Sequence, residues 1–91
     1  MRIKAIKVEP SIAIKIFQKH NVQEEEMYEA LKDGNPQFRR VGGEQYVAIG
    51  LSKSRYITIF FRYNHRMKEA EITTAYPSDK KQIKSYKKVK K

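Results

Sequence analysis

Apolar and polar residues alternate with period two in several parts of this chain, and such alternation predicts β-strands because successive strand side chains point to opposite faces. The predicted strands cover residues 2–8, 45–51, 55–63 and 69–76. In the third of these, Ile57, Ile59 and Phe61 are expected to face the helices. In the fourth, one face is expected to carry Ala70, Ile72 and Thr74.

Other parts of the chain have apolar residues three and four positions apart, which is typical of amphipathic helices. These predicted helices cover residues 11–20, residues 24–33 and a last segment that follows Ser78-Asp79. Pro10 is tolerated in a first helical turn, and Asn21 suits a left-handed C-terminal cap. Glu26 lies three residues after Gln23, where its side chain can complete a capping box.

The connections between these elements predict the topology. Lys53-Ser54 and residues 64–67 are short, so the strands on either side are expected to be antiparallel neighbours. Residues 38–41 form either a further strand or an extended loop, ended by Gly42-Gly43. The predicted fold class is α+β, with an N-terminal strand, two helices, an antiparallel meander sheet and a C-terminal helix. Residues 1–91 are expected to form one domain with a frayed, lysine-rich tail at about residues 87–91.

Positive charge is concentrated in two parts of the chain. The formal net charge is +10, and residues 35–68 contain seven Lys/Arg but only one carboxylate, Glu44. Cations in this segment alternate with apolar residues, so a sheet would fix their positions. The lysines of the tail are less informative, because lysine runs often serve only solubility. The pattern predicts an acidic partner, with nucleic acid foremost and an acidic protein second.

Several classes of site and location are not expected. The chain has no cysteine, which excludes disulfides and thiol nucleophiles. His20 and His65 are far apart in the sequence, and neither has a carboxylate cluster near it, so no metal or cofactor is expected. His20 at a helix end is interpreted as a cap or core-edge residue rather than a catalyst, and His65 as solvent-exposed. No signal peptide and no 18-residue apolar run is present, so a cytoplasmic protein without a membrane partner is expected.

A series of short motifs resembles a known family over about residues 9–87. The motifs are Lys19-His20-Asn21-Val22, residues 35–41, residues 43–50, Ser54-Arg55-Tyr56-Ile57, Ile72-Thr73-Thr74-Ala75 and Tyr86. In this order and spacing they resemble the BrnT-like toxins, small members of the RelE/ParE superfamily of type II toxin–antitoxin systems. The resemblance implies a RelE-like fold with a three-stranded antiparallel meander. It also implies metal-independent ribonuclease activity, held in check by an antitoxin.

The chain differs from that family pattern at two positions. Such toxins usually have Ser-Ala-Arg after the last strand, with the arginine in the active site, whereas this chain has Thr74-Ala75-Tyr76. Ser54 replaces the glycine that usually precedes the arginine at the start of the middle strand.

Metal-free RNA cleavage by the 2′-hydroxyl requires deprotonation of that hydroxyl, stabilisation of the phosphorane and protonation of the leaving oxygen. The catalytic candidates are Arg55, Tyr76, Glu44 and Tyr86. The candidates for RNA binding are Arg39, Arg40, Lys53 and Arg62. A guanidinium can bind two phosphate oxygens at once, and a phenol can donate a proton or stack on a base. The central expectation is one patch formed by Arg39, Arg40, Arg55 and Tyr76.

Each candidate also has an ordinary structural interpretation. Arg39 and Arg40 are adjacent on an extended segment and must point to opposite sides, so one of them could pair with the acidic second helix. Arg55 could merely close a turn, and the tyrosines could serve sheet packing.

Two alternatives to a ribonuclease toxin follow from the same residues. One is a non-catalytic RNA- or ribosome-binding domain, which the tyrosine at position 76 favours. The other is a protein-interaction domain that binds an acidic peptide, as a toxin does with an acidic antitoxin. The sequence leaves open ribosome-associated mRNA as the substrate and a homodimer as the assembly.

Overall fold

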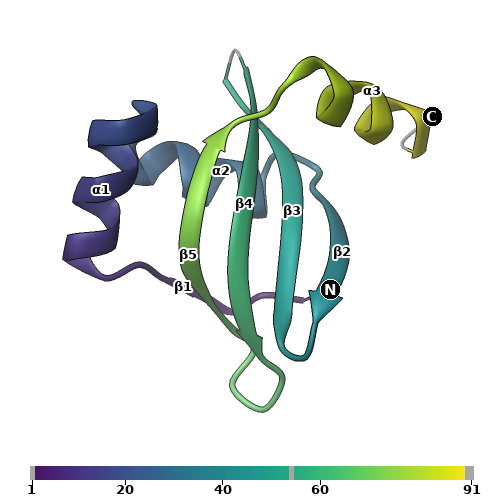
Figure 1. Ribbon diagram of the computed structural model, residues 1–91. Coiled ribbons are helices and arrows are strands. Elements are labelled where there is room, and N and C mark those ends of the chain that lie inside the picture. The colour runs from purple at the N-terminus through teal and green to yellow at the C-terminus, as the bar shows by residue number, and fades with distance from the viewer. Residues whose placement is uncertain (1, 54, 90–91) are drawn as a thin grey trace.

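The computed structural model describes residues 2–53 and 55–89, which form an α+β fold of three helices and five strands (Figure 1). The elements in chain order are β1 Ala5–Lys7, α1 Pro10–His20, α2 Glu24–Lys32, β2 Gln37–Gly42, β3 Gln45–Ser52, β4 Arg55–Asn64, β5 Glu69–Pro77 and α3 Lys80–Val89. The predicted fold class is confirmed. The end of the predicted frayed tail, residues 90–91, lies outside the described residues, as does Ser54.

The five strands form one sheet in the order β1-β5-β4-β3-β2. Strands β2 to β5 are an antiparallel meander, so residues 38–41 belong to a strand and the meander has four strands rather than three. The N-terminal strand is shorter than the predicted 2–8. It pairs in parallel with β5 only from Ala5 to Lys7, because β5 begins at Glu69 and the chain then turns away into α1.

The helix ends follow local signals in the sequence. Pro10 lies in the first turn of α1, and Asn21 caps the other end in the left-handed conformation (φ 56°), with its N–H donating to the Phe17 carbonyl at 2.9 Å. At the start of α2, the Glu26 carboxylate accepts the Gln23 backbone N–H at 3.1 Å. Both predicted caps are confirmed.

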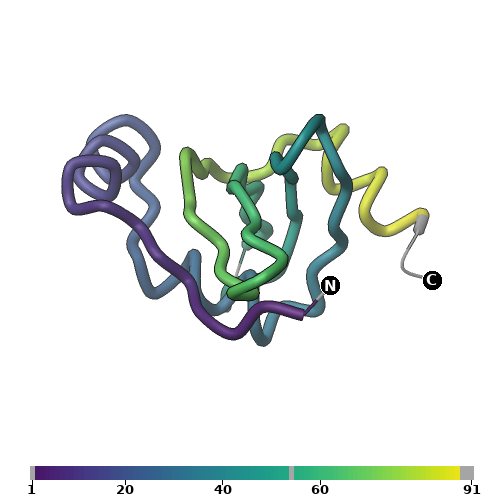
Figure 2. Tube along the Cα trace, turned by 90° about the horizontal axis from the view of Figure 1, so that it is seen from below, coloured from purple at the N-terminus to yellow at the C-terminus, as the bar shows by residue number. Residues whose placement is uncertain are grey.

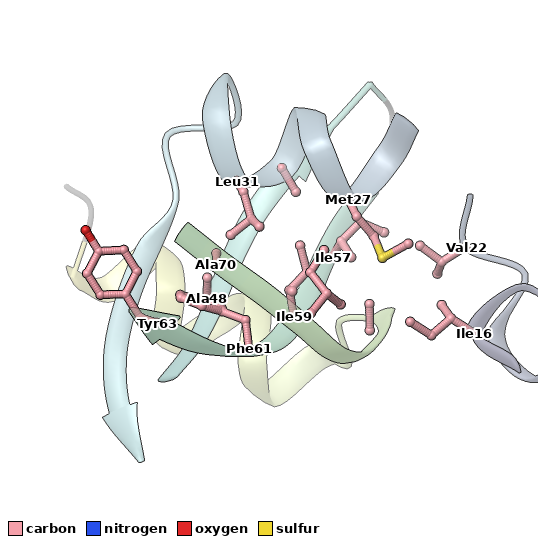
Figure 3. Packing of buried hydrophobic residues seen from close by; sticks show 13 residues of the cluster. Ile16, Val22, Met27, Leu31, Ala48, Ile57, Ile59, Phe61, Tyr63 and Ala70 are labelled. Carbon is pink, nitrogen blue, oxygen red and sulfur yellow. The ribbon is translucent and has the colours of Figure 1, made fainter. Parts of the chain in front are cut away.

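The core lies between α2, the end of α1 and one face of the sheet. Figure 3 shows Met27 and Leu31 of α2 pointing towards the sheet, with Ile57 and Ile59 below them. The predicted inward face of β4 is confirmed, since Ile57, Ile59 and Phe61 are at most 1% exposed. Figure 2, seen along the strands, shows α1 beside β5 on one side of the sheet and α3 towards the other side.

A β-bulge in β5 changes which side chains reach the core. Phe61 pairs with Ile72 but Phe60 pairs with Thr74, so Thr73 is an extra residue in β5. Thr74 therefore lies on the face opposite Ile72, and the predicted shared face of Ala70, Ile72 and Thr74 is wrong at its last position. Ala75 takes the core position, and Tyr76 is turned to the other face.

Helix α2 lies unusually close to β3. A Cβ built on Gly50 would be 2.1 Å from the Ala30 carbonyl oxygen, and one on Gly34 would be 2.2 Å from the Leu51 carbonyl oxygen. Both neighbours are backbone atoms, which cannot rotate away as a side chain can. The two glycines are therefore required by the distance between helix and sheet.

Gly50→Ala is expected to lower the free energy of unfolding by about 2–3 kcal/mol, because the added methyl group forces α2 away from β3. Urea unfolding followed by circular dichroism measures this loss. Gly42→Ala is the matched control: a Cβ there meets no atom within 4 Å, so its effect should stay within about 0.5 kcal/mol. Equal losses in the two variants would contradict the proposed close contact.

Candidate nucleic-acid interface

One face of the sheet is covered by α2 and the end of α1, and we call the opposite face the open face. Cross-strand neighbours share a face, so the strand register identifies its side chains. Two rows cross the four antiparallel strands on this face, Arg39–Val47–Phe60–Thr74 and Gln37–Ile49–Thr58–Tyr76. Most of these side chains are partly exposed, which leaves apolar, aromatic and cationic groups accessible together.

A hydrogen-bond network joins α3 to one end of the open face. The Gln82 amide N–H donates to the Tyr76 hydroxyl oxygen at 3.2 Å, and its carbonyl oxygen accepts from Thr58 at 3.1 Å. Thr58 and Ser78 exchange a further bond between their hydroxyls at 2.7 Å. Gln82 itself is held by Asp79, whose carboxylate accepts the Gln82 backbone N–H at 2.7 Å. The Tyr76 hydroxyl is thus held in a fixed position.

A groove of about 310 Å³ lies between α3 and the open face. Its apolar part is formed by Val47, Ile49 and Phe60, and its polar part includes Arg39 and Gln82. Tyr76 adjoins it, with its ring centroid 6.1 Å from that of Phe60. The groove and Tyr76 therefore form one continuous surface.

His20 lies next to this surface, although it is 56 positions from Tyr76 in the sequence. The two ring centroids are 5.7 Å apart, and the imidazole is partly buried. Asn21, not His20, caps α1, so the cap interpretation of His20 is wrong, whereas its partial burial agrees with the core-edge interpretation. Sequence periodicity contains no signal for this pairing. His20 was singled out in the sequence only as part of the motif Lys19-His20-Asn21-Val22.

Arg55 lies on the opposite face and is bound to structural partners. Its guanidinium donates to both carboxylate oxygens of Glu26 at 2.8 Å and to the Asn21 carbonyl oxygen at 2.7 Å. The hydrogen bonds from Arg55 lower the pKa of Glu26, and the same carboxylate raises the pKa of Arg55. Arg55 thus fastens the end of α1 and the start of α2 to β4.

Tyr86 also has a structural environment. Its hydroxyl donates to the Asn35 carbonyl oxygen at 2.7 Å, and its ring centroid is 5.2 Å from that of Tyr56. Burial raises the pKa of the Tyr86 phenol above its usual value. Lys53 lines a separate recess beside these two tyrosines. This group holds α3 on the sheet, away from the groove.

The remaining candidates lie apart from Tyr76. Arg40 points to the covered side of β2 and donates to the Gly43 carbonyl oxygen at 2.9 Å, not to the acidic second helix. Glu44 and Arg62 form an exposed ion pair, with 3.9 Å between nitrogen and oxygen. Arg62 is four positions along β4 from Thr58, the partner of Tyr76, and at about 3.3 Å per residue this separation is ~13 Å.

The expected single patch of four residues is therefore not present. Arg39 and Tyr76 share the open face, whereas Arg40 and Arg55 lie on the other. Among the described residues, no three His, Asp or Glu side chains come together as a metal site. None of the helices formed by residues 2–53 and 55–89 is long and apolar enough to span a membrane.

Comparison with known proteins identifies a similar fold. No protein-family model and no curated protein matches the sequence. The crystal structure of the ribonuclease toxin BrnT from Brucella abortus is similar, with a TM-score of 0.68 and 11% sequence identity. The match covers 84% of this chain and 97% of that one. At this identity the likeness establishes a BrnT-like fold.

Glu26→Gln is expected to lower the free energy of unfolding at pH 7 by about 1 kcal/mol, because it removes the charge from a partly exposed, bidentate ion pair. The pKa of Glu26 in the folded protein lies below its usual 4.5. The ionised carboxylate therefore stabilises the fold above that pH, and this contribution is lost as the pH falls through the lower, folded-state pKa.

Urea titrations of the unaltered protein and of Glu26→Gln between pH 7 and pH 2 measure the difference in their free energies of unfolding. It should be constant near neutral pH and disappear in acid. Glu25→Gln is the control, since Glu25 is an exposed neighbour on the same helix turn. A difference for Glu26→Gln that persisted at the acid end would show that the ion pair is not its source.

Proposed function

We propose that this protein is the toxin of a type II toxin–antitoxin pair, a metal-independent ribonuclease that binds RNA on the open face of its sheet. The observation that carries the proposal is the fold, which matches nearly the whole length of a ribonuclease toxin. The net charge of +10 adds to this support, because a polyanion is the natural partner of so basic a surface.

The open face offers both kinds of group that bind single-stranded RNA. Arg39 and Lys81 lie beside the groove and can contact phosphates. Phe60 and Tyr76 present aromatic rings on which bases can stack, and such stacking contributes about 1–3 kcal/mol per base. Cations and rings on one rigid face suit a strand of splayed nucleotides better than a duplex, whose bases are not accessible.

His20 and Tyr76 are the residues that we assign to the cleavage step. The His20 imidazole removes the proton of the ribose 2′-hydroxyl, whose oxygen attacks the adjacent phosphorus. The bond from phosphorus to the 5′-oxygen breaks, and Tyr76 gives its proton to that oxygen. The products are a 2′,3′-cyclic phosphate and a 5′-hydroxyl. The Gln82 amide donates to the Tyr76 oxygen, so it stabilises the phenolate that remains until the proton returns.

This assignment differs from the sequence-based one in the use of arginine. Arg55 is engaged by Glu26 and by the Asn21 carbonyl, so its role in this proposal is to position α1 and thereby His20. Glu44 and Tyr86 have no part in the chemistry. Arg39 binds a backbone phosphate.

A non-catalytic RNA- or ribosome-binding domain is the second candidate. Its support is that Arg40 and Arg55 are engaged in contacts within the protein. Of the three arginines expected in one patch, Arg39 is then the one that lies on the open face. Both candidates use the same surface, so only cleavage separates them. Incubation of the protein with a long RNA in EDTA is the direct test, since intact RNA that remains tightly bound favours the second candidate.

An acidic antitoxin completes the proposal. A disordered acidic segment can follow a basic surface and fold on it, and occupation of the open face would block RNA at the same time. The proposal places the pair in the cytoplasm, where its RNA substrate is found.

Arg39→Gln is expected to weaken RNA binding about tenfold at low salt and to lower the slope of log affinity against log salt by about 1. Arg40→Gln is the matched control, because it removes the same charge from the next residue of the same strand but on the opposite face. Fluorescence anisotropy with a single-stranded RNA at several salt concentrations measures both. Equal losses would mean that only net charge matters and that the open face is not the binding surface.

His20→Gln and Tyr76→Phe are each expected to slow RNA cleavage at least about a hundredfold in EDTA, the usual contribution of a general acid or base. RNA affinity should change little, because neither substitution removes a formal positive charge from the groove. His65→Gln and Tyr46→Phe are the controls, since these side chains contact each other away from the open face. Growth arrest on expression should be lost with the first pair of variants and kept with the second.

Full cleavage by the His20 and Tyr76 variants would contradict the assigned roles. Failure of the unaltered protein to cut RNA or to arrest growth would contradict the proposal that it is a ribonuclease toxin.

A further inference from the structure

We infer that the groove between α3 and the open face is a nucleobase subsite in which Phe60 stacks on adenine and Gln37 reads its edge. This inference rests on the proposed RNA-binding function and adds a base preference to it. It depends on the groove's size, on its division into apolar and polar parts, and on a side-chain amide without a partner.

The groove has the dimensions and composition of a site for one nucleotide. Its volume of about 310 Å³ lies at the lower end of the range for small-molecule sites, about 300–1,000 Å³. Val47, Ile49 and Phe60 give it an apolar floor, on which a planar base can be buried. The polar residues of the lining, among them Gln37 and Gln82, can select the orientation of the base.

The Gln37 side chain supplies an uncharged polar group that can bind a ligand in the groove. It is partly buried on β2 and lines the groove. Among the described residues, no hydrogen bond to its amide is present. The other amide of the groove, Gln82, is already bonded to Thr58 and Tyr76. The Gln37 carboxamide can donate to N7 of adenine and accept from N6, whereas the same edge of guanine presents two acceptors, N7 and O6. The smaller rings of uracil and cytosine stack less on Phe60.

The rim also holds cations where a nucleotide has its phosphate. Arg39 follows Gln37 by two positions on the same face of β2, and Lys81 lies across the groove on α3. Tyr76 is next to Phe60, with 6.1 Å between their ring centroids. A base held in the groove would therefore place a neighbouring phosphate of the same RNA strand beside the proposed cleavage residues.

The test uses the four nucleoside 5′-monophosphates and the full chain, with binding followed by amide chemical shifts in NMR. We expect AMP to shift the signals of Gln37, Phe60 and Gln82, and to bind about tenfold more tightly than GMP, whose N7/O6 edge offers the amide no donor. Gln37→Leu should abolish the preference for AMP while leaving weak binding to all four. Gln18→Leu, the same change on an exposed position of α1, should leave the preference intact.

Phe60→Leu provides a second variant, which keeps an apolar side chain but removes the aromatic ring. It should weaken binding of all four nucleotides, while an unchanged circular dichroism spectrum confirms the fold. Absence of shifts in the groove at about 10 mM nucleotide, where a site of ~1 mM affinity is roughly nine-tenths filled, would overturn the subsite. Equal affinity for the four nucleotides in the unaltered protein would overturn the reading role of Gln37.

These outcomes are separate from the fate of the proposed function. If long RNA is bound and cut but no mononucleotide binds in the groove, the inferred subsite is wrong and the proposed ribonuclease function is unaffected. If AMP binds in the groove but RNA is neither bound nor cut, the ribonuclease is wrong and the groove is a site for a free adenine nucleotide.

Discussion

The backbone contact between α2 and β3 determines which face of the sheet is available for function. Gly50 and Gly34 allow carbonyl oxygens to approach within distances that a Cβ would not permit. Because α2 lies this close, Met27 and Leu31 can reach the middle of the sheet and bury Ile57 and Ile59 completely. One layer of helices is then enough for the core. Helix α3 packs on the second face at one end, and most of the apolar and aromatic side chains there stay partly accessible.

The bulge at Thr73 connects that core to the candidate site. In a regular strand, Tyr76 would share a face with Ile72 and point to the covered side. The extra residue reverses the alternation, so that Ala75 enters the core and Tyr76 pairs with Thr58 on the open face. Bulges are often found next to active sites because they redirect a single side chain in this way. Here the small Ala75 suits the crowded interior, whereas the phenol is placed within reach of Gln82.

The sequence predicted the features that depend on residues close together in the chain. Asn21 and the pair of Gln23 and Glu26 are separated from their partners by three or four residues, so caps and helix ends could be read directly. The alternation in β4 likewise identified its buried face. The bulge could not be predicted, because Thr73 and Thr74 are equally polar and either fits either face. The pairing of His20 with Tyr76 depends on how α1 lies against the β5 edge, which no periodicity contains.

Arg55 illustrates why residue type alone does not predict the contacts that a side chain makes. A guanidinium in a basic segment suggests phosphate binding, but this one is nearest to the acidic first turn of α2. Its two bonds to Glu26 oppose a competing phosphate, because a ligand would have to displace a bidentate carboxylate and leave that charge without a partner. The same pairing keeps the acidic turn on the covered side of the sheet. Arg39 faces the open side and takes part in neither of the ion pairs found among the described residues. In the proposed function, a phosphate would therefore meet no competing carboxylate at Arg39.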